Sequence, residues 1–222
     1  MGSPRVIFFD LDGCILDSTE PILACHNAAL AEFGLAPIAR RDIARYIGPP
    51  LQATVAEILA ERGKGDELVG PVVEAYRNRY LQVSIEMALT YRGVPELLDD
   101  LAGTERLAVC TSKASVYAVA ILEHLGLSRH FETIAGPPLN PPEPKVDTLA
   151  RALDDLSPLD PSCSVMVGDR HHDIEAGRHH GLVPVGVTWG FGSRDELSAA
   201  GASVIVDTPE QLAAALADTL GR

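Results

Sequence analysis

The sequence predicts an α/β protein in which a parallel sheet is covered by helices on both faces and a separate helical segment is inserted near the start. Two observations lead to this prediction. Short apolar runs alternate with stretches of helical period along most of the chain, which is typical of parallel sheets joined by crossover helices. Residues 17–87, in contrast, contain no convincing strand.

The predicted core begins with an apolar strand and then alternates strands with helices. Strands are expected near residues 5–9, 106–110, 132–135, 164–168, 184–188 and 203–206. Helices are expected near residues 94–102, 115–125, 146–155, 173–180, 194–200 and 209–219. The run Ser164–Val167 is almost continuously apolar, as burial between two helical layers requires. We therefore expect a Rossmann-like core domain formed by residues 1–16 and 88–222.

Residues 17–87 are expected to form a helical cap domain. Three stretches in this segment have helical period, and glycine or Gly-Pro punctuation separates them. They cover residues 17–33, 51–62 and 67–83. The segment joins the core twice, near Asp17 and near Leu89–Gly93, so we expect it to act as a lid over the core.

Composition excludes several classes of protein. The chain has 222 residues and a formal net charge of −13, which argues against binding nucleic acid because phosphates need a basic face. No apolar stretch reaches the roughly 18–20 residues of a membrane span, and the N-terminus does not read as a signal peptide. The cysteines lack metal or redox spacing, so we expect reduced thiols in a cytoplasmic protein, with Cys110 and Cys163 in core strands.

Two acidic residues follow the first predicted strand. Asp10 and Asp12 lie one residue apart and Gly13 comes directly after them. Residues two apart on a strand point the same way, so both carboxylates can face one small volume. Their repulsion then requires a cation or a shared proton. The alternative is a surface turn in which Asp and Gly have their usual turn roles.

Polar residues also follow two other predicted strands, and one begins a predicted helix. Asp169 and Asp173 come after an apolar strand, and together with the first pair they make an oxygen-rich site of the kind that Mg²⁺ prefers. Thr111 and Ser112 follow another strand, and Lys145 opens a helix; hydroxyl, ammonium and helix-start N–H groups suit a phosphate oxygen. Helix capping by the hydroxyls and a solvated surface position for Lys145 are the alternatives.

The order of these motifs resembles the haloacid dehalogenase-like hydrolase superfamily, and most of all its phosphoglycolate-phosphatase-type branch with a helical cap. The motifs are Asp10-Leu11-Asp12-Gly13, Thr111, Lys145, and Gly168-Asp169 with Asp173. The resemblance covers nearly the whole chain. It implies a Mg²⁺-dependent phosphomonoesterase that hydrolyses a small phosphorylated metabolite, phosphoglycolate or a related ester, through an aspartyl phosphate.

The resemblance also implies a role for each motif residue. Asp10 would be the nucleophile and Asp12 the general acid and base. Mg²⁺ would be held by Asp10, the backbone carbonyl of Asp12, Asp169 and Asp173, the last directly or through water. The phosphoryl oxygens would be held by Gly13, Thr111, Ser112 and Lys145. Candidates for substrate choice in the cap are Arg45, Gly48 and Arg77; the alternative is that both arginines are exposed helix charges.

Other functions remain open. The alternatives are a sugar-phosphate mutase of the same superfamily and a catalytically silent binding protein. A dehalogenase is disfavoured because its relatives lack the second acid, here Asp12. A phosphonate hydrolase would need a Schiff-base lysine from the cap, and the only cap lysine, Lys64, lies in an unsuitable glycine turn. His171 and His172 suggest a metal site, but solvated loop residues are the expectation. The sequence leaves open both the ester and whether the protein is a monomer or a dimer.

Overall fold

The structure, a computed structural model, describes residues 5–141, 143–219 and 221. The chain divides into two compact units. The first contains the described residues up to Asp17 and those from Thr90 onward, and the second is Ser18–Leu89. Each unit has its own packed interior.

The first unit is built on six parallel strands in the order β3-β2-β1-β4-β5-β6. Their bounds are β1 Val6–Phe9, β2 Arg106–Cys110, β3 Thr133–Ala135, β4 Val165–Gly168, β5 Val183–Val187 and β6 Val204–Val206. Strand β1 is central, and Phe8 pairs with Ala108 of β2 and Met166 of β4. All four residues of β1 are buried and apolar, which suits a strand with helices on both sides.

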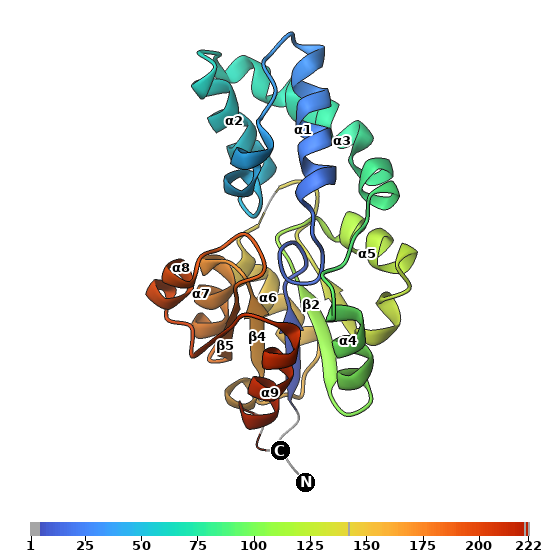
Figure 1. Ribbon diagram of the computed structural model, residues 1–222, viewed down its shortest axis with the longest axis vertical. Helices are drawn as coiled ribbons and strands as arrows, with labels where there is room; N and C mark the ends of the chain where they lie inside the picture. Colours follow the sequence, from blue (N-terminus) through green and yellow to red (C-terminus); the bar gives the residue numbers. More distant parts are fainter. Residues whose placement is uncertain (1–4, 142, 220, 222) are drawn as a thin grey trace. The chain divides into compact units, whose positions relative to one another are not determined.

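Helices cover both faces of this sheet (Figure 1): α4 packs on β2 and against α9 on one face, and α6 and α7 pack together on the other. Their bounds are α4 Val94–Ala102, α5 Ser115–His124, α6 Lys145–Asp155, α7 His171–His179, α8 Arg194–Ala200 and α9 Pro209–Thr219, with short 3₁₀ turns η3 Ser128–His130 and η4 Pro161–Cys163. Phe8 and Met166 share a buried cluster with Leu149 of α6 and Ala176 of α7. Burying each such large side chain contributes about 1.5–3 kcal/mol.

The first residue after each of three neighbouring strands carries a polar side chain at the same edge of the sheet. Asp10 follows β1, Thr111 follows β2 and Asp169 follows β4. The Asp10 N–H donates to Val167 O at 2.8 Å and the Thr111 N–H donates to Ala135 O at 2.9 Å, so the ladder holds the backbone at both positions. Ligands of open α/β sheets bind at this carboxyl edge.

The chain leaves and re-enters the first unit at adjacent points. After β1 a tight loop folds back on itself, with Leu16 N–H donating to Leu11 O at 2.8 Å. Leu16 then forms an antiparallel bridge with Thr90, and Tyr91 N–H donates to Ile15 O at 3.1 Å. The ends of the inserted segment are therefore held side by side.

The second unit is helical. It contains α1 Thr19–Glu32, α2 Leu51–Glu61 and α3 Val69–Glu86, with 3₁₀ turns η1 Arg40–Tyr46 and η2 Asp66–Leu68. Helix α1 packs mainly against α3, where His26 contacts the ring of Tyr76 with centroids 4.6 Å apart. Tyr76 in turn stacks on Tyr80.

The predicted fold class, a parallel sheet between helical layers, is confirmed. Several predicted bounds differ from the observed ones by one to three residues, and two of the differences concern chemically interesting residues. Helix α7 begins at His171 rather than at Asp173, and Cys163 is exposed in η4 instead of buried in a strand, because the chain turns at residues 160–164 before β4 begins. Within the described residues, no helix is long and apolar enough to cross a membrane.

Candidate active site

Three buried carboxylates meet at the carboxyl edge of the sheet. Asp10, Asp169 and Asp173 each offer an oxygen, and these oxygens lie within 4.8 Å of one another. Asp10 and Asp169 come from the ends of adjacent strands, and Asp173 comes from the first turn of α7. The sheet thus brings together acids that are about 160 positions apart in the sequence.

Lys145 supplies the cation of this cluster. It is the first residue of α6, it is buried, and its Nζ lies 2.7 Å from Asp10 Oδ1 and also pairs with Asp173 Oδ1. Burial alone would lower the pKa of Lys145, but the charges of Asp10 and Asp173 outweigh it and the pKa is raised. Lys145 is therefore an ammonium ion, not a neutral amine.

One lysine does not satisfy three carboxylates. Asp10 Oδ1 has Lys145 as a partner, but among the described residues no hydrogen bond reaches Asp169 Oδ1, although this atom is buried. The other oxygen of Asp169 accepts the Phe191 N–H at 2.7 Å. Buried oxygens without partners are unfavourable, and three carboxylates with one ammonium retain an excess of negative charge. A divalent cation with oxygen ligands fits both the charge and the donor set.

The protonation of the acids reflects this crowding. Burial, followed by the charge of Asp173, raises the pKa of Asp10 to about 7, even though Lys145 opposes the shift. Burial and the charges of Asp173 and Asp10 also raise the pKa of Asp169. The ionised forms of Asp10 and Asp169 are thus destabilised by their surroundings, which is the situation that a bound dication relieves.

The Asp12 side chain pairs with Lys113, whereas that of Asp10 pairs with Lys145. Its Oδ1 lies 2.8 Å from Lys113 Nζ, and the lysine side chain is buried. Asp12 is therefore not one of the side chains that meet at the three-carboxylate cluster, although it lies in the same loop as Gly13. The loop turns after Asp10, so the strand alternation that would place both acids in one volume ends there.

Gly13 allows this turn to approach Asp169. Its φ is +90°, a left-handed conformation that residues with a β-carbon rarely adopt. A β-carbon at Gly13 would lie 2.7 Å from Asp169 Oδ1, closer than a non-bonded carbon and oxygen can approach. The backbone of the loop is thus packed directly on the carboxylate.

The candidate phosphoryl-binding residues lie around the same edge. Thr111 is buried directly after β2, and its Oγ1 accepts the Lys113 N–H at 3.1 Å. Ser112 is half-buried between them. Together with Gly13 and Lys145, these residues come from three loops that follow or precede core elements of the first unit.

Sequence reasoning missed the loop after β5. Trp189 Nε1 donates to Cys14 O at 3.1 Å, and Phe191 donates its N–H to Asp169. Gly190 packs so closely that its β-carbon would lie 2.6 Å from Asp169 Cβ. The only signal was a Gly-containing segment directly after a predicted strand, whereas the other loops were identified by their acidic, hydroxyl or lysine side chains.

The candidate cap residues lie in the second unit. Arg45, in η1, pairs with Glu57 and Glu61 of α2 at 2.5 Å each, and Tyr46 donates to Glu61 at 2.7 Å. Gly48 has φ +109° in the connection between η1 and α2. Arg77 is half-buried on α3.

Comparison with known proteins identifies relatives of the chain. Residues 7–187 match the family of haloacid dehalogenase-like hydrolases. The chain is 41% identical over 207 residues to "Tyrosine-protein kinase PtkA" of Mycobacterium tuberculosis, covering 91% of this chain and 68% of that protein. It is 36% identical over 197 residues to a 5'-nucleotidase of Pseudomonas aeruginosa, covering 87% of this chain and 86% of that protein. The crystal structure of a predicted phosphatase from Clostridium acetobutylicum superimposes with a TM-score of 0.88 at 29% identity, covering 98% of this chain and 100% of that one.

Proposed function

The chain belongs to the haloacid dehalogenase-like hydrolases and is a phosphatase, and on this basis we propose that it hydrolyses a small phosphate monoester with Mg²⁺ through an aspartyl phosphate on Asp10. The observation that carries the proposal is the buried cluster of Asp10, Asp169 and Asp173, with Lys145 in contact with two of its members. Asp10 follows the first strand, where the proposed nucleophile is expected, and two further carboxylates that could bind a metal ion lie beside it.

Mg²⁺ would be held by Asp10, the backbone carbonyl of Asp12, Asp169 and Asp173. Its chemistry is to screen the carboxylate from the anionic phosphate and to stabilise charge on the transferring group. The buried Asp169 Oδ1, which accepts no hydrogen bond among the described residues, supports this assignment. Asp173 already accepts the Arg170 N–H at 2.9 Å with Oδ2 and contacts Lys145 with Oδ1, which supports a weaker or water-mediated contribution.

The residues of the chain would carry the two chemical steps. In the first, an oxygen of Asp10 forms a bond to phosphorus, the ester oxygen leaves, and Asp12 gives that oxygen a proton. In the second, Asp12 takes a proton from water as the water oxygen bonds to phosphorus and the bond to Asp10 breaks. Inorganic phosphate is released and both acids return to their starting states.

Thr111, Ser112, Gly13 and Lys145 would hold the phosphoryl oxygens during both steps. A hydroxyl, backbone N–H groups and an ammonium ion stabilise the charge that develops on those oxygens. The buried positions of Thr111 and Lys145 support this role, because hydrogen bonds away from water are stronger.

Residues 17–87 would form the cap that chooses the ester and excludes water, with Arg45, Gly48 and Arg77 as candidate contacts. The division of the chain at Ser18 and Leu89 supports a separate cap. Arg45→Ala and Arg77→Ala should then change the relative kcat/KM among esters with different leaving groups and leave the Mg²⁺ requirement unchanged. An unchanged ranking in both variants would place substrate choice elsewhere.

A panel of phosphate esters, assayed for released phosphate with Mg²⁺ and with a chelator, tests the proposed function. The panel includes 2-phosphoglycolate, nucleoside 5'-monophosphates and sugar phosphates, because the sequence resemblance and the nucleotidase relative point to different substrates. We expect Mg²⁺-dependent hydrolysis of at least one ester by the wild type and by Asp147→Asn, an exposed matched control, and no hydrolysis by Asp10→Asn.

The same panel separates the alternatives. A sugar-phosphate mutase would convert one sugar phosphate into its isomer without releasing phosphate. A silent binding protein would bind an ester without converting it. Transfer of phosphate from ATP to a tyrosine peptide would instead match the name of the mycobacterial relative. Any of these results, in place of hydrolysis, would contradict the proposal.

A further inference from the structure

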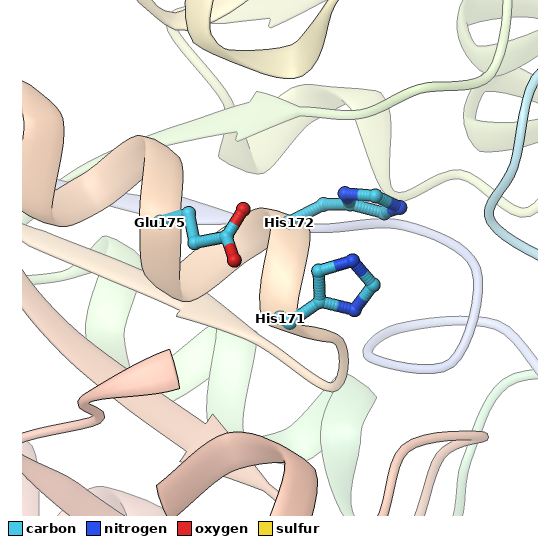
Figure 2. A group of neighbouring side chains, drawn as sticks. All are labelled: His171, His172 and Glu175. Atoms are coloured by element: carbon cyan, nitrogen blue, oxygen red, sulfur yellow. The ribbon is translucent and has the colours of Figure 1, made fainter. Parts of the chain in front are cut away.

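A second group of metal-ligand side chains lies on the first turn of α7, outside the three-carboxylate cluster. His171, His172 and Glu175 each offer one ligand atom, and these atoms lie within 4.8 Å of one another. The two histidines are half-buried and Glu175 is exposed. In Figure 2 the Glu175 carboxylate extends along the helix surface toward the two imidazoles.

The spacing of these residues follows from helix geometry. Successive residues of an α-helix are rotated by roughly 100°, so Glu175 lies about 40° from His171 and about 60° from His172 around the axis. Viewed along the axis, Glu175 therefore lies at an angle between the two histidines and about one turn further along the helix, and the two imidazole rings have centroids 3.8 Å apart. We propose that His171, His172 and Glu175 bind a transition-metal dication such as Zn²⁺ at a site separate from the Mg²⁺ centre.

The surroundings of His171 support ligation by this ring. His171 Nδ1 lies 2.8 Å from Glu196 Oε1. Because a carboxylate only accepts, the ring proton is on Nδ1 and the lone pair of Nε2 is available for a metal. Metal-ligating histidines usually donate their second nitrogen to a carboxylate or carbonyl in this way. Glu196 is itself held by the Arg170 side chain at 2.9 Å and the His171 N–H at 3.0 Å.

The ligand set distinguishes this site from the carboxylate centre. Two imidazoles and one carboxylate suit Zn²⁺ or Cu²⁺, whereas Mg²⁺ prefers oxygen ligands. Three protein ligands leave the fourth position of a tetrahedral Zn²⁺ site for water. With bonds of about 2.0–2.2 Å, the ligand atoms must approach to roughly 3.3 Å, which rotation of one exposed and two half-buried side chains allows.

Local charges are compatible with a cation. A helix N-terminus carries partial positive charge, which opposes a metal ion, but the effect is small compared with that of formal charges in contact with the ion. Arg170 is already paired with Glu196, and Glu175 faces the site with a full negative charge. The chain as a whole carries −13, so the long-range field also favours a dication.

Calorimetric titration with Zn²⁺ tests the proposal on full-length protein without a histidine tag. The Asp169→Asn background removes one proposed ligand of the carboxylate centre, so Zn²⁺ binding that depends on His172 and Glu175 reports on the second site. In that background we expect about one Zn²⁺ per chain. Adding His172→Gln or Glu175→Gln should weaken binding at least about tenfold, the lower end of the effect of losing only a supporting partner. His179→Gln, an exposed histidine at the other end of α7, is the matched control and should bind as the background does.

A second measurement identifies the ligand atoms. Cu²⁺ bound to the same background should show nitrogen splitting in its electron paramagnetic resonance spectrum, and His172→Gln should reduce that splitting. Circular dichroism of each variant confirms folding, and Glu175 is exposed, so its substitution leaves the core intact. Absence of Zn²⁺ binding in the background, or equal affinity in His172→Gln and His179→Gln, would overturn the proposed site.

Discussion

Lys145 Nζ lies 2.7 Å from Asp10 Oδ1, so the first residue of α6 is paired with the first residue after β1. The pair joins the proposed nucleophile to a cation that is also in contact with Asp173. Removing the charge of Asp10 therefore removes the proposed nucleophile. It does not leave Lys145 without a partner, because Lys145 still pairs with Asp173.

Asp10→Asn should abolish turnover with little change in the folded structure. The amide has nearly the same shape but is not a nucleophile, and Lys145 still has Asp173 as a partner. Steady-state phosphate release and a thermal melt test the two parts of this prediction. Retention of more than about a tenth of the wild-type turnover, equivalent to a loss below about 1.4 kcal/mol, would contradict the role of Asp10. Asp147→Asn is the control.

Asp169→Ala should weaken Mg²⁺ binding more than Asp173→Ala does. Asp169 Oδ1 is buried without a hydrogen bond among the described residues, whereas Asp173 uses both oxygens, on Lys145 and on the Arg170 N–H. Calorimetric titration of both variants with Mg²⁺ measures the order. Equal losses, or a larger loss in Asp173→Ala, would reverse our assignment of the direct ligand.

Gly13→Ala should lower both stability and Mg²⁺ affinity. The substitution imposes φ +90° on a residue with a β-carbon, a strain of about 1–3 kcal/mol, and drives that carbon against Asp169. Gly181→Ala is the matched control, because Gly181 has φ +76° but nothing within 4 Å of its β-carbon position. Urea unfolding should show a loss in both variants, and Mg²⁺ titration a loss in Gly13→Ala alone. Unchanged Mg²⁺ affinity in Gly13→Ala would show that the close packing does not position Asp169.

The stability of the second unit should fall as the pH is lowered from about 6.5 to 4. Burial, followed by the charge of Arg62, lowers the pKa of His26 to about 4. Because the unfolded chain binds this proton near pH 6.5, protonation favours unfolding, and stability present above that pH is lost as the pH falls through the folded value. The shift corresponds to about 3 kcal/mol at most.

Urea unfolding at pH 7.5 and pH 4.5 checks the role of His26. His26→Leu should reduce the difference in unfolding free energy between the two pH values, whereas His124→Gln, at an exposed position in the first unit, should not. The same pH dependence in wild type and His26→Leu would assign it to other groups.

The sequence predicted elements well where the apolar pattern and the local chain signals agree. Strand β2 and helices α4, α8 and α9 begin and end at the predicted residues, and the three helices are bounded by glycine, proline or capping residues. Helix α7 begins two residues early because the Asp173 carboxylate accepts the Arg170 N–H from inside the first turn. An aspartate at this position and one at the cap look alike in sequence.

Pairings between distant loops were beyond the reach of a single sequence. The ion pair between Asp12 and Lys113 joins residues about a hundred positions apart, and no local spacing encodes it. The contact of Phe191 with Asp169 likewise depends on β5 lying beside β4. The order of the motifs predicted at which strand ends the acidic residues lie. It did not predict which partners their side chains contact.

The bridge between Leu16 and Thr90 allows the core to carry inserted segments of different lengths. The bridge holds the two ends of the inserted segment together, so the strands of the sheet can pair whether the insertion is a short linker or a long domain. The entropic cost of closing the inserted loop also rises only slowly with its length. Insertions of different size and shape can therefore be accommodated here during evolution without rebuilding β1. With the proposed role of residues 17–87 in choosing the ester, substrate range would diversify at this junction while the carboxylate cluster keeps its geometry.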